Sequence, residues 1–298
     1  SFVERQLARA RMGWYEAFEL NRPTVFYSTH GGAEWTGAAF DPLSGRLYVT
    51  VNHRPSITTV FRDDDPRPAV PMSEGEKVYQ TLCAACHGKD RTGVGGAPPL
   101  RGLRHHADDG AVRTLLRTGR GLMPPQPGLE GASLDALLDF LMCRDRGKGL
   151  VEGETVRYGS DGYRKLDDHE GYPGVKPPWG SLACLDLNTG RRQWQVVLGE
   201  HEELTAKGVP KTGTHNFGGA MVTAGGVVFA SGTMDSRVYA FDASDGRELW
   251  SAKMPFAGSA PPMTYVAGGR QYLVVPATGG GKTGMPSGDA WVAFALPE

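Results

Sequence analysis

The sequence has no strong excess of either charge. Its 298 residues carry 32 Lys and Arg against 33 Asp and Glu, for a formal net charge of -1. The sequence contains no cluster of basic residues, which binding to nucleic acid or to an acidic membrane surface would require. We expect neither as a partner.

Long apolar runs are also missing. None approaches the ~20 residues of a membrane-spanning helix, and residues 1–20 carry scattered charges where a signal peptide would have an apolar stretch. We therefore expect any secretory signal to lie outside this chain, and the sequence leaves membrane association open. The length is ample for a buried core and predicts more than one domain.

Cysteine is scarce, and its spacing is informative. Of four cysteines, Cys83 and Cys86 form a CxxC followed directly by His87, whereas Cys143 and Cys184 stand alone. That is no disulfide framework. A thioredoxin-like dithiol would require a βαβ context, and a zinc site would require a second ligand pair.

The CxxCH pattern instead predicts covalent haem c. Cys83 and Cys86 would form the thioethers, and His87 would be the proximal iron ligand. Because such haem is normally attached on the exported side of a bacterial membrane, we expect the protein in the periplasm or on the periplasmic face of the inner membrane.

Residues 73–146 resemble a class I cytochrome c. A helical pattern begins at Glu74, residues 88–102 form a Gly- and Pro-rich loop, and residues 108–117 and 134–143 regain helical periodicity. Met123 lies between them in an extended segment followed by two prolines, and we predict it as the distal iron ligand. Met142, within the last helical pattern, is expected in the core.

Other side chains of this segment have alternative interpretations. His105 and His106 are rival iron ligands or surface histidines, and Arg120 pairs with a haem propionate or is solvated. A His/Met pair raises the haem potential relative to two histidines, which suits a haem that accepts electrons from an organic donor.

The remaining sequence repeats itself. Residues 183–194 and 240–250 share an Asp-x-x-x-Gly turn with a Trp four residues after the Gly, and such self-similarity indicates a repeat architecture. Residues 218–253 predict a complete four-stranded blade of a β-propeller, and residues 262–296 predict three strands of another. Residues 35–51 and 181–197 would each give two strands of one blade, with the cytochrome between them.

The fold class is therefore mainly β, a partial β-propeller of about three four-stranded blades with an inserted all-α cytochrome c domain. The expected organisation is a lead-in at 1–29, two blade strands at 30–62, the cytochrome at 73–146, a linker at 147–178 and the remaining blades at 179–298. Three blades cannot close a ring, so we expect this chain to be the C-terminal part of a larger protein, with its N-terminal propeller half missing. A β-sandwich is the alternative.

The long connections of these blades fall on one face. They include the haem insertion and residues 199–218, 254–260 and 276–289. Loops of such length on one face usually carry a binding site. We expect the haem on the ligand-binding face.

Four segments carry a family resemblance: residues 30–42 (HGGAEWTGAAFDP), 176–180 (KPPWG), 213–219 (GTHNFGG) and 288–289 (GD). They resemble the C-terminal blades of pyrroloquinoline quinone (PQQ) dependent dehydrogenases, in the membrane glucose dehydrogenase-like branch with a cytochrome c domain. The resemblance implies an eight-bladed propeller that binds PQQ and Ca²⁺. It also implies oxidation of an alcohol or sugar, with electrons passing through the haem to a periplasmic cytochrome or quinone acceptor. Its catalytic residues lie in earlier blades, so this chain alone should be inactive.

The resemblance places Trp35, Glu34, Asn216 and Lys282 in the possible PQQ pocket. Relatives typically have Asn where Glu34 stands, and a carboxylate there would repel the tricarboxylated quinone unless it is protonated or paired. Trp35 could instead be a core residue, Asn216 a turn former and Lys282 a solvated cation. Glu34 favours a second function: an electron-transfer protein whose propeller is a non-catalytic scaffold that binds no quinone. The substrate, the oligomeric state and the downstream acceptor are left open.

Overall fold

The computed structural model describes residues 2–13, 15–27, 32–63, 72–94, 97–145, 157–162 and 164–297, except for the side chains of Asp63, Arg157 and Lys282. The chain divides into two compact units. One comprises Ser1–Phe26 and Ile57–Arg164, and the other comprises Tyr27–Ser56 and Lys165–Glu298. Much of the predicted linker, residues 147–156 and 163, lies outside the described residues.

The first blade is assembled across the insertion, as the sequence predicts. Its strands are β3 (Ala39–Asp41), β4 (Arg46–Asn52), β8 (Gly180–Asp186) and β9 (Arg191–Val197), in the order β3-β4-β8-β9. Strands β4 and β8 pair in antiparallel fashion from Arg46↔Asp186 to Asn52↔Gly180. The strands that flank the cytochrome in the sequence are therefore neighbours in one sheet.

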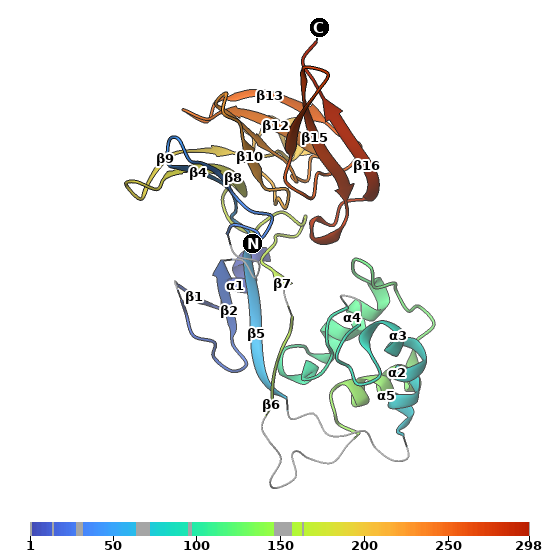
Figure 1. Cartoon of the computed structure of the whole chain (residues 1–298). Helices are drawn as coiled ribbons and strands as arrows, with labels where there is room; N and C mark the ends of the chain where they lie inside the picture. Colours follow the sequence, from blue (N-terminus) through green and yellow to red (C-terminus); the bar gives the residue numbers. More distant parts are fainter. Residues whose placement is uncertain are drawn as a thin grey trace. The chain divides into compact units, whose positions relative to one another are not determined.

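Two further sheets follow in sequence order (Figure 1). The second is a complete antiparallel meander of β10 (Ala220–Val222), β11 (Val227–Ala230), β12 (Arg237–Asp242) and β13 (Glu248–Lys253). The third has three strands, β14 (Met263–Ala267), β15 (Arg270–Gly279) and β16 (Ser287–Phe294). This is the partial propeller of the predicted fold class.

The repeated Asp-x-x-x-Gly motif forms the turn between the last two strands of a blade. Gly190 N donates to Asp186 O at 2.7 Å, and Gly246 N donates to Asp242 O at 2.9 Å. Both glycines have positive φ, 69° and 78°, which a side chain rarely adopts. The motif repeats because each blade needs this reversal.

The tryptophan that follows the turn contacts the next sheet. Trp194 Nε1 donates to Ala243 O at 3.2 Å, and the Tyr48 hydroxyl donates to the same oxygen at 3.2 Å. In the second blade, Trp250 meets the edge of Phe294 at 5.2 Å between ring centroids. Apolar cores join the sheets pairwise: one contains Tyr48, Leu182, Val228 and Phe241, and the next contains Val238, Leu273 and Val275.

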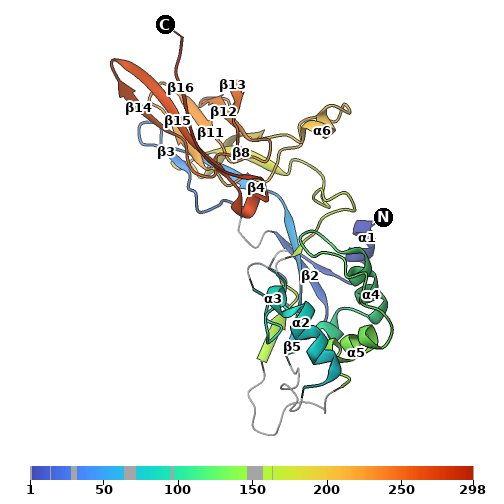
Figure 2. The ribbon, with the colours of Figure 1, turned by 90° about the vertical axis from the view of Figure 1, so that its right-hand side faces the viewer.

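The cytochrome segment is helical (Figure 2). Ser73 Oγ accepts from Glu76 N at 3.1 Å and caps its first helix, and a Cβ at Gly75 would collide with Ala136 O. This glycine allows the first and last helices to pack closely around a core that contains Tyr79 and Leu137. The elements are α2 (Glu74–Leu82), α3 (Ala84–His87), η1 (Leu103–His105), α4 (Asp109–Thr118) and α5 (Gly131–Leu141).

The last helix begins earlier than predicted, at Gly131, and it ends at Leu141, before Met142. Met142 is buried in the cytochrome core at 6% exposure, which is the role expected for it. Among the described residues, no helix combines the length and apolar character needed to cross a membrane.

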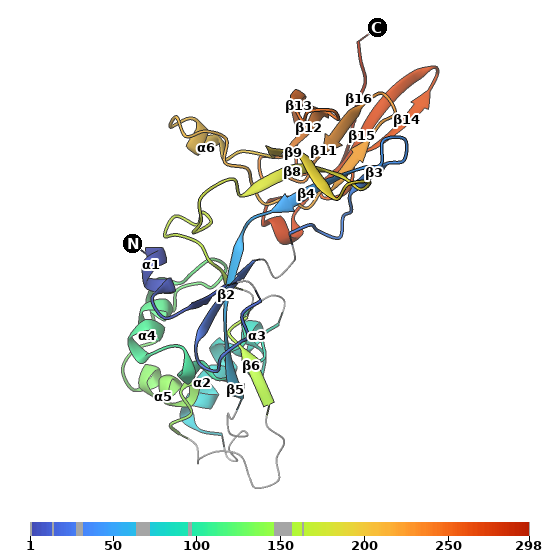
Figure 3. The same cartoon turned by 90° about the vertical axis from the view of Figure 1, so that its left-hand side faces the viewer.

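A small sheet was not predicted (Figure 3). It contains β1 (Arg11–Met12), β2 (Pro23–Tyr27), β5 (Pro55–Asp63) and β6 (Arg157–Ser160), and β7 (Arg164–Lys165) also pairs with β5. Helix α1 (Phe2–Leu7) precedes it. These strands come from three distant segments and most are short, so local periodicity does not reveal their pairing.

Candidate functional site

Segments that connect the strands meet at one edge of the first two blades. Trp179 N, just before β8, donates to Thr212 O at 2.7 Å, and Thr214 N donates to Leu198 O at 3.0 Å. A Cβ at Gly180 would collide with Thr214 O. The segment 212–218 therefore packs backbone to backbone against the first blade, and glycine permits that approach.

Asn52 and Asn216 form a buried amide pair at this edge. Asn52 Nδ2 donates to Asn216 O at 2.9 Å, while Asn52 Oδ1 accepts from Asn216 N at 2.9 Å and from Asn216 Nδ2 at 3.0 Å. Within the described residues, the buried Oδ1 of Asn216 has no hydrogen-bond partner. Asn216 therefore links two blades and retains one acceptor for a ligand or a solvent molecule.

Glu34 lies beside this pair, and its side chain is fully buried. Its Oε1 accepts from Asn52 Nδ2 at 3.2 Å and lies 3.9 Å from His215 Nε2. Burying a carboxylate is costly unless it has partners. The carboxylate is therefore held by neighbouring side chains and is not an isolated charge.

Trp35 is not a core residue, because 70% of it is exposed. Its ring lies 6.3 Å from the ring of Phe217, and Phe217 meets the edge of His215 at 4.4 Å. The structure thus brings Glu34, Trp35 and Asn216 into one neighbourhood. Lys282 belongs to η2 (Gly281–Thr283), but its side chain lies outside the described residues.

A narrow cavity of about 40 Å³ opens beside His215. One wall is an aromatic cluster in which Trp179 stacks on Tyr172 at 5.8 Å and meets His201 at 5.5 Å. On another side, Arg54 forms an ion pair with Asp167 at 2.5 Å. No motif in the sequence marked Arg54 or His201, although the KPPWG and GTHNFGG segments contain Trp179 and His215, which line the same cavity.

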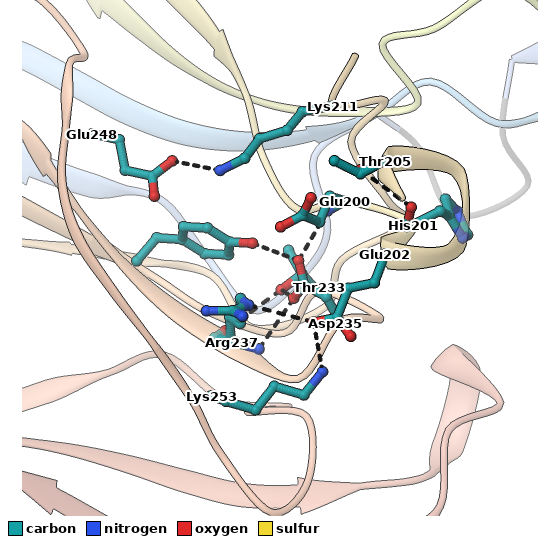
Figure 4. Close-up of polar contacts among 11 residues, drawn as sticks. Glu200, His201, Glu202, Thr205, Lys211, Thr233, Asp235, Arg237, Glu248 and Lys253 are labelled. Atoms are coloured by element: carbon teal, nitrogen blue, oxygen red, sulfur yellow. Dashed lines mark hydrogen bonds and ion pairs between the residues drawn. The ribbon is translucent and has the colours of Figure 1, made fainter. Parts of the chain in front are cut away.

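The connection 199–218, which includes α6 (Glu202–Thr205), is anchored by Asp235 (Figure 4). This buried carboxylate accepts from Glu200 N at 2.9 Å, Tyr239 Oη at 2.5 Å and Thr233 Oγ1 at 2.5 Å. Burial and the nearby Asp235 raise the pKa of Tyr239, so its hydroxyl stays protonated and donates. Nearby, Lys253 Nζ donates to Glu202 at 2.9 Å, and Lys211 Nζ donates to Glu248 at 3.0 Å.

In the cytochrome segment, His87 is buried at 7% exposure and its ring is oriented by the backbone. Its Nδ1 lies 2.9 Å from Pro98 O. Because a carbonyl only accepts, Nδ1 carries the proton and Nε2 keeps its lone pair, as a metal-ligating histidine requires.

Cys83 and Met123 pack against the same apolar core of the cytochrome segment. Cys83 and Cys86 are free thiols, and burial, with Cys86 beside it, raises the pKa of Cys83 to about 11. A redox dithiol has a lowered thiol pKa instead. Arg120 and Met123 pair through their backbones at 3.0 and 3.1 Å, in a tight turn that fixes Met123. These residues suit a covalent haem.

The rival ligands His105 and His106 have another partner. Both rings stack on Phe61 of β5, with centroids 6.0 and 5.5 Å away. The structure therefore places the two histidines against the small sheet of the same unit.

Comparison with known proteins finds similarity in both parts of the chain. A model described as glucose/ethanol/alcohol dehydrogenase, beta-propeller domain, matches residues 144–273, and one described as cytochrome C oxidase, cbb3-type, subunit III, matches residues 70–141. The chain is 39% identical over 132 residues to quinoprotein glucose dehydrogenase A of Acinetobacter calcoaceticus, which covers 43% of this chain and 16% of that protein.

It is also 36% identical over 158 residues to the glycerol dehydrogenase large subunit of Gluconobacter oxydans, covering 51% of this chain and 21% of that protein. The chain thus spans about a fifth or less of the length of these curated relatives. A solved quinohemoprotein alcohol dehydrogenase from Comamonas testosteroni matches 85% of this chain and 23% of its own, at 17% identity and a TM-score of 0.41. So low a score supports no argument about the site.

Replacing the central anchor should loosen the 199–218 connection. Asp235→Asn removes one of the two carboxylate oxygens, which accepts from Tyr239 Oη and Glu200 N. We expect the free energy of unfolding to fall by about 1–3 kcal/mol, measured by urea denaturation, and proteolysis within 199–218 to become faster.

Asp245→Asn is the matched control. Asp245 is exposed and accepts only from Arg247 N at 2.9 Å, which an amide oxygen also does. Its effect should stay within about 0.5 kcal/mol. Equal stability losses in the two variants would contradict the anchoring role of Asp235.

Proposed function

We propose that this chain, whose propeller and cytochrome residues match the two family models, supplies blades and the electron-accepting haem of a PQQ-dependent alcohol or sugar dehydrogenase. The observation that carries the proposal is the pairing of β4 with β8 on either side of the cytochrome. That pairing attaches a one-electron carrier to a propeller of the type that binds the quinone.

In this proposal, Cys83 and Cys86 would hold haem c through thioethers, and His87 and Met123 would bind its iron. The hydrogen bond from His87 Nδ1 to Pro98 O supports it, because that bond directs the other ring nitrogen to a metal. The packing of Cys83 and Met123 on one core supports it too. With His87 and Met123 both bound to the iron, the haem would supply electron transfer and would leave no position for oxygen.

For PQQ, the proposed contacts are Trp35, Glu34, Asn216 and Lys282. The buried, unbonded Oδ1 of Asn216 fits a ligand that donates a hydrogen bond, and the exposed face of Trp35 fits a planar ring system. Glu34 is engaged by Asn52 near His215, so its role is to orient that amide pair. When bound, PQQ would supply two-electron oxidation chemistry, and the haem would supply one-electron acceptance.

Further parts of the proposal rest on the family and on propeller geometry. Three blades do not close a ring, so additional blades would complete the propeller and bring the catalytic residues and Ca²⁺. A periplasmic cytochrome or quinone would take the electrons from the haem, in the periplasm or at the periplasmic face of the inner membrane. No catalytic residue is proposed in this chain.

The distal ligand can be tested spectroscopically. Met123→Leu should abolish the long-wavelength sulfur-to-iron band of the ferric protein and lower the haem reduction potential, because the thioether stabilises ferrous iron. Optical titration against redox mediators measures both. Met142→Leu, at a buried core methionine, is the matched control and should leave both unchanged. An intact band in Met123→Leu would refute Met123 as ligand.

The dehydrogenase function can be tested by haem reduction. In the protein with a complete propeller, loaded with PQQ and Ca²⁺ and mixed with a panel of alcohols and aldoses, at least one substrate should reduce the haem. Trp35→Ala should weaken PQQ binding about three- to tenfold, because the free energy of one aromatic contact is lost. Trp35→Phe should retain most of the affinity.

The same experiment distinguishes the alternative function. A haem that stays oxidised with every substrate, despite bound PQQ, would indicate electron transfer alone. If PQQ does not bind at all, the propeller is a scaffold without quinone. The chain without its additional blades should show no turnover with any substrate.

A further inference from the structure

A cavity of about 220 Å³ lies in the unit that contains the cytochrome and the small sheet. It is lined from five segments that are distant in sequence: the end of α1, the start of β2, β5, η1 and β7. The side chains that matter here are Arg9, Asn21, Thr59, His105, His106 and Arg164. None of them is among the residues proposed to hold haem or PQQ.

This lining carries positive charge and hydrogen-bond donors. Two arginines and two histidines face the cavity, and no carboxylate is among the described residues that line it. The carboxylate of Asp161 is buried, accepts from Thr59 N at 2.8 Å and pairs with Arg164 at 2.5 Å. The charge of Arg164 is thus neutralised by Asp161.

Arg9 remains as a surplus charge. Its backbone oxygen accepts from Arg22 Nε at 3.1 Å, which ties the backbone at Arg9 to the segment before β2. Over the described part of the chain, its guanidinium makes no hydrogen bond or ion pair, and it is exposed to solvent at the cavity. A permanent cation at an open cavity favours an anion.

The histidines add a titratable charge. Both rings stack on Phe61, with centroids 6.0 and 5.5 Å away. Although His106 keeps an exposed side, the protein packed around its ring lowers its pKa; Arg164 and His105 lower it further, and Asp161 opposes them. His106 is therefore mainly neutral at neutral pH in the empty cavity.

We propose that this cavity is a binding site for a small oxyanion of two or more negative charges, such as inorganic phosphate or a di- or tricarboxylic acid. Its volume is below the range of drug-sized ligand pockets, which suits such a compact ligand. Planar guanidinium groups recognise phosphate and carboxylate oxygens through paired hydrogen bonds. The bound anion would connect the N-terminal segment, β5 and the cytochrome.

Binding is coupled to protons. An anion beside His106 favours its charged form and raises its pKa, so the complex takes up a proton that the free protein lacks. Affinity should therefore increase as the pH falls from about 8 to about 6, the interval around the ordinary pKa of histidine. The charged groups that face this ring are Arg164 and His105, with Asp161 behind them.

The test is calorimetric titration of the haem-loaded chain with inorganic phosphate, sulfate, citrate and acetate. We expect saturable binding of the multivalent anions, none of acetate, and a rise in melting temperature with ligand concentration. Sulfate carries the pH series, because its own charge is constant over that range. A preference for citrate over phosphate and sulfate would identify a carboxylate site, and the reverse an inorganic oxyanion site.

Arg9→Gln should weaken binding about tenfold, since one charge-assisted contact is lost. Arg117→Gln is the matched control, because Arg117 is an exposed arginine of α4 in the same unit, away from the cavity. It should change the affinity less than twofold. His106→Gln, a second variant, should weaken the pH dependence while circular dichroism shows an intact fold.

Three outcomes would overturn the proposal. They are no saturable binding of any multivalent anion at millimolar concentration, equal weakening by Arg9→Gln and Arg117→Gln, and a sulfate affinity that does not change with pH. None of these outcomes depends on PQQ or on dehydrogenase turnover.

Discussion

The pairing of β4 with β8 is the constraint on which the rest of this structure depends. It joins residues on either side of a long insertion in one antiparallel ladder, from Arg46↔Asp186 to Asn52↔Gly180. The entropy of closing a loop grows only slowly with its length, so a whole cytochrome is tolerated between two neighbouring strands. The last pair of this ladder, Asn52 and Gly180, organises the candidate site.

Those two residues act in different ways. Asn52 links the first blade to Asn216 and holds Glu34, whereas Gly180 leaves room for Thr214 O. Asp235 then fixes the connection that leads to Asn216. These three contacts attach the candidate site to the sheets of the first two blades. Binding residues are held more accurately on such elements than on loops.

Local signals in the sequence predicted much of this arrangement. The Asp-x-x-x-Gly turn and its tryptophan are set by backbone geometry within a few residues, so the blades and their strand order were predictable. CxxCH and the helical periodicities around it likewise marked the cytochrome. The ligand roles of His87 and Met123 and the PQQ contacts stay predictions.

Other features have no local signal. Asn52 and Asn216 are 164 positions apart, and their pairing depends on the way the blades stack. The small sheet combines short strands from distant segments, and the cavity beside it gathers Arg9, His106 and Arg164 from equally distant ones. Trp35 and Glu34 are adjacent in sequence yet differ in exposure, which only the tertiary fold decides.

The central claim is a haem bound covalently through Cys83 and Cys86. The direct measurement is a pyridine haemochrome spectrum of protein matured in a host that attaches haem c, taken after extraction with acidified acetone. The account predicts that one haem per chain stays with the protein and shows the spectrum of a thioether-linked porphyrin. Colourless protein, or haem that the solvent extracts, would contradict it.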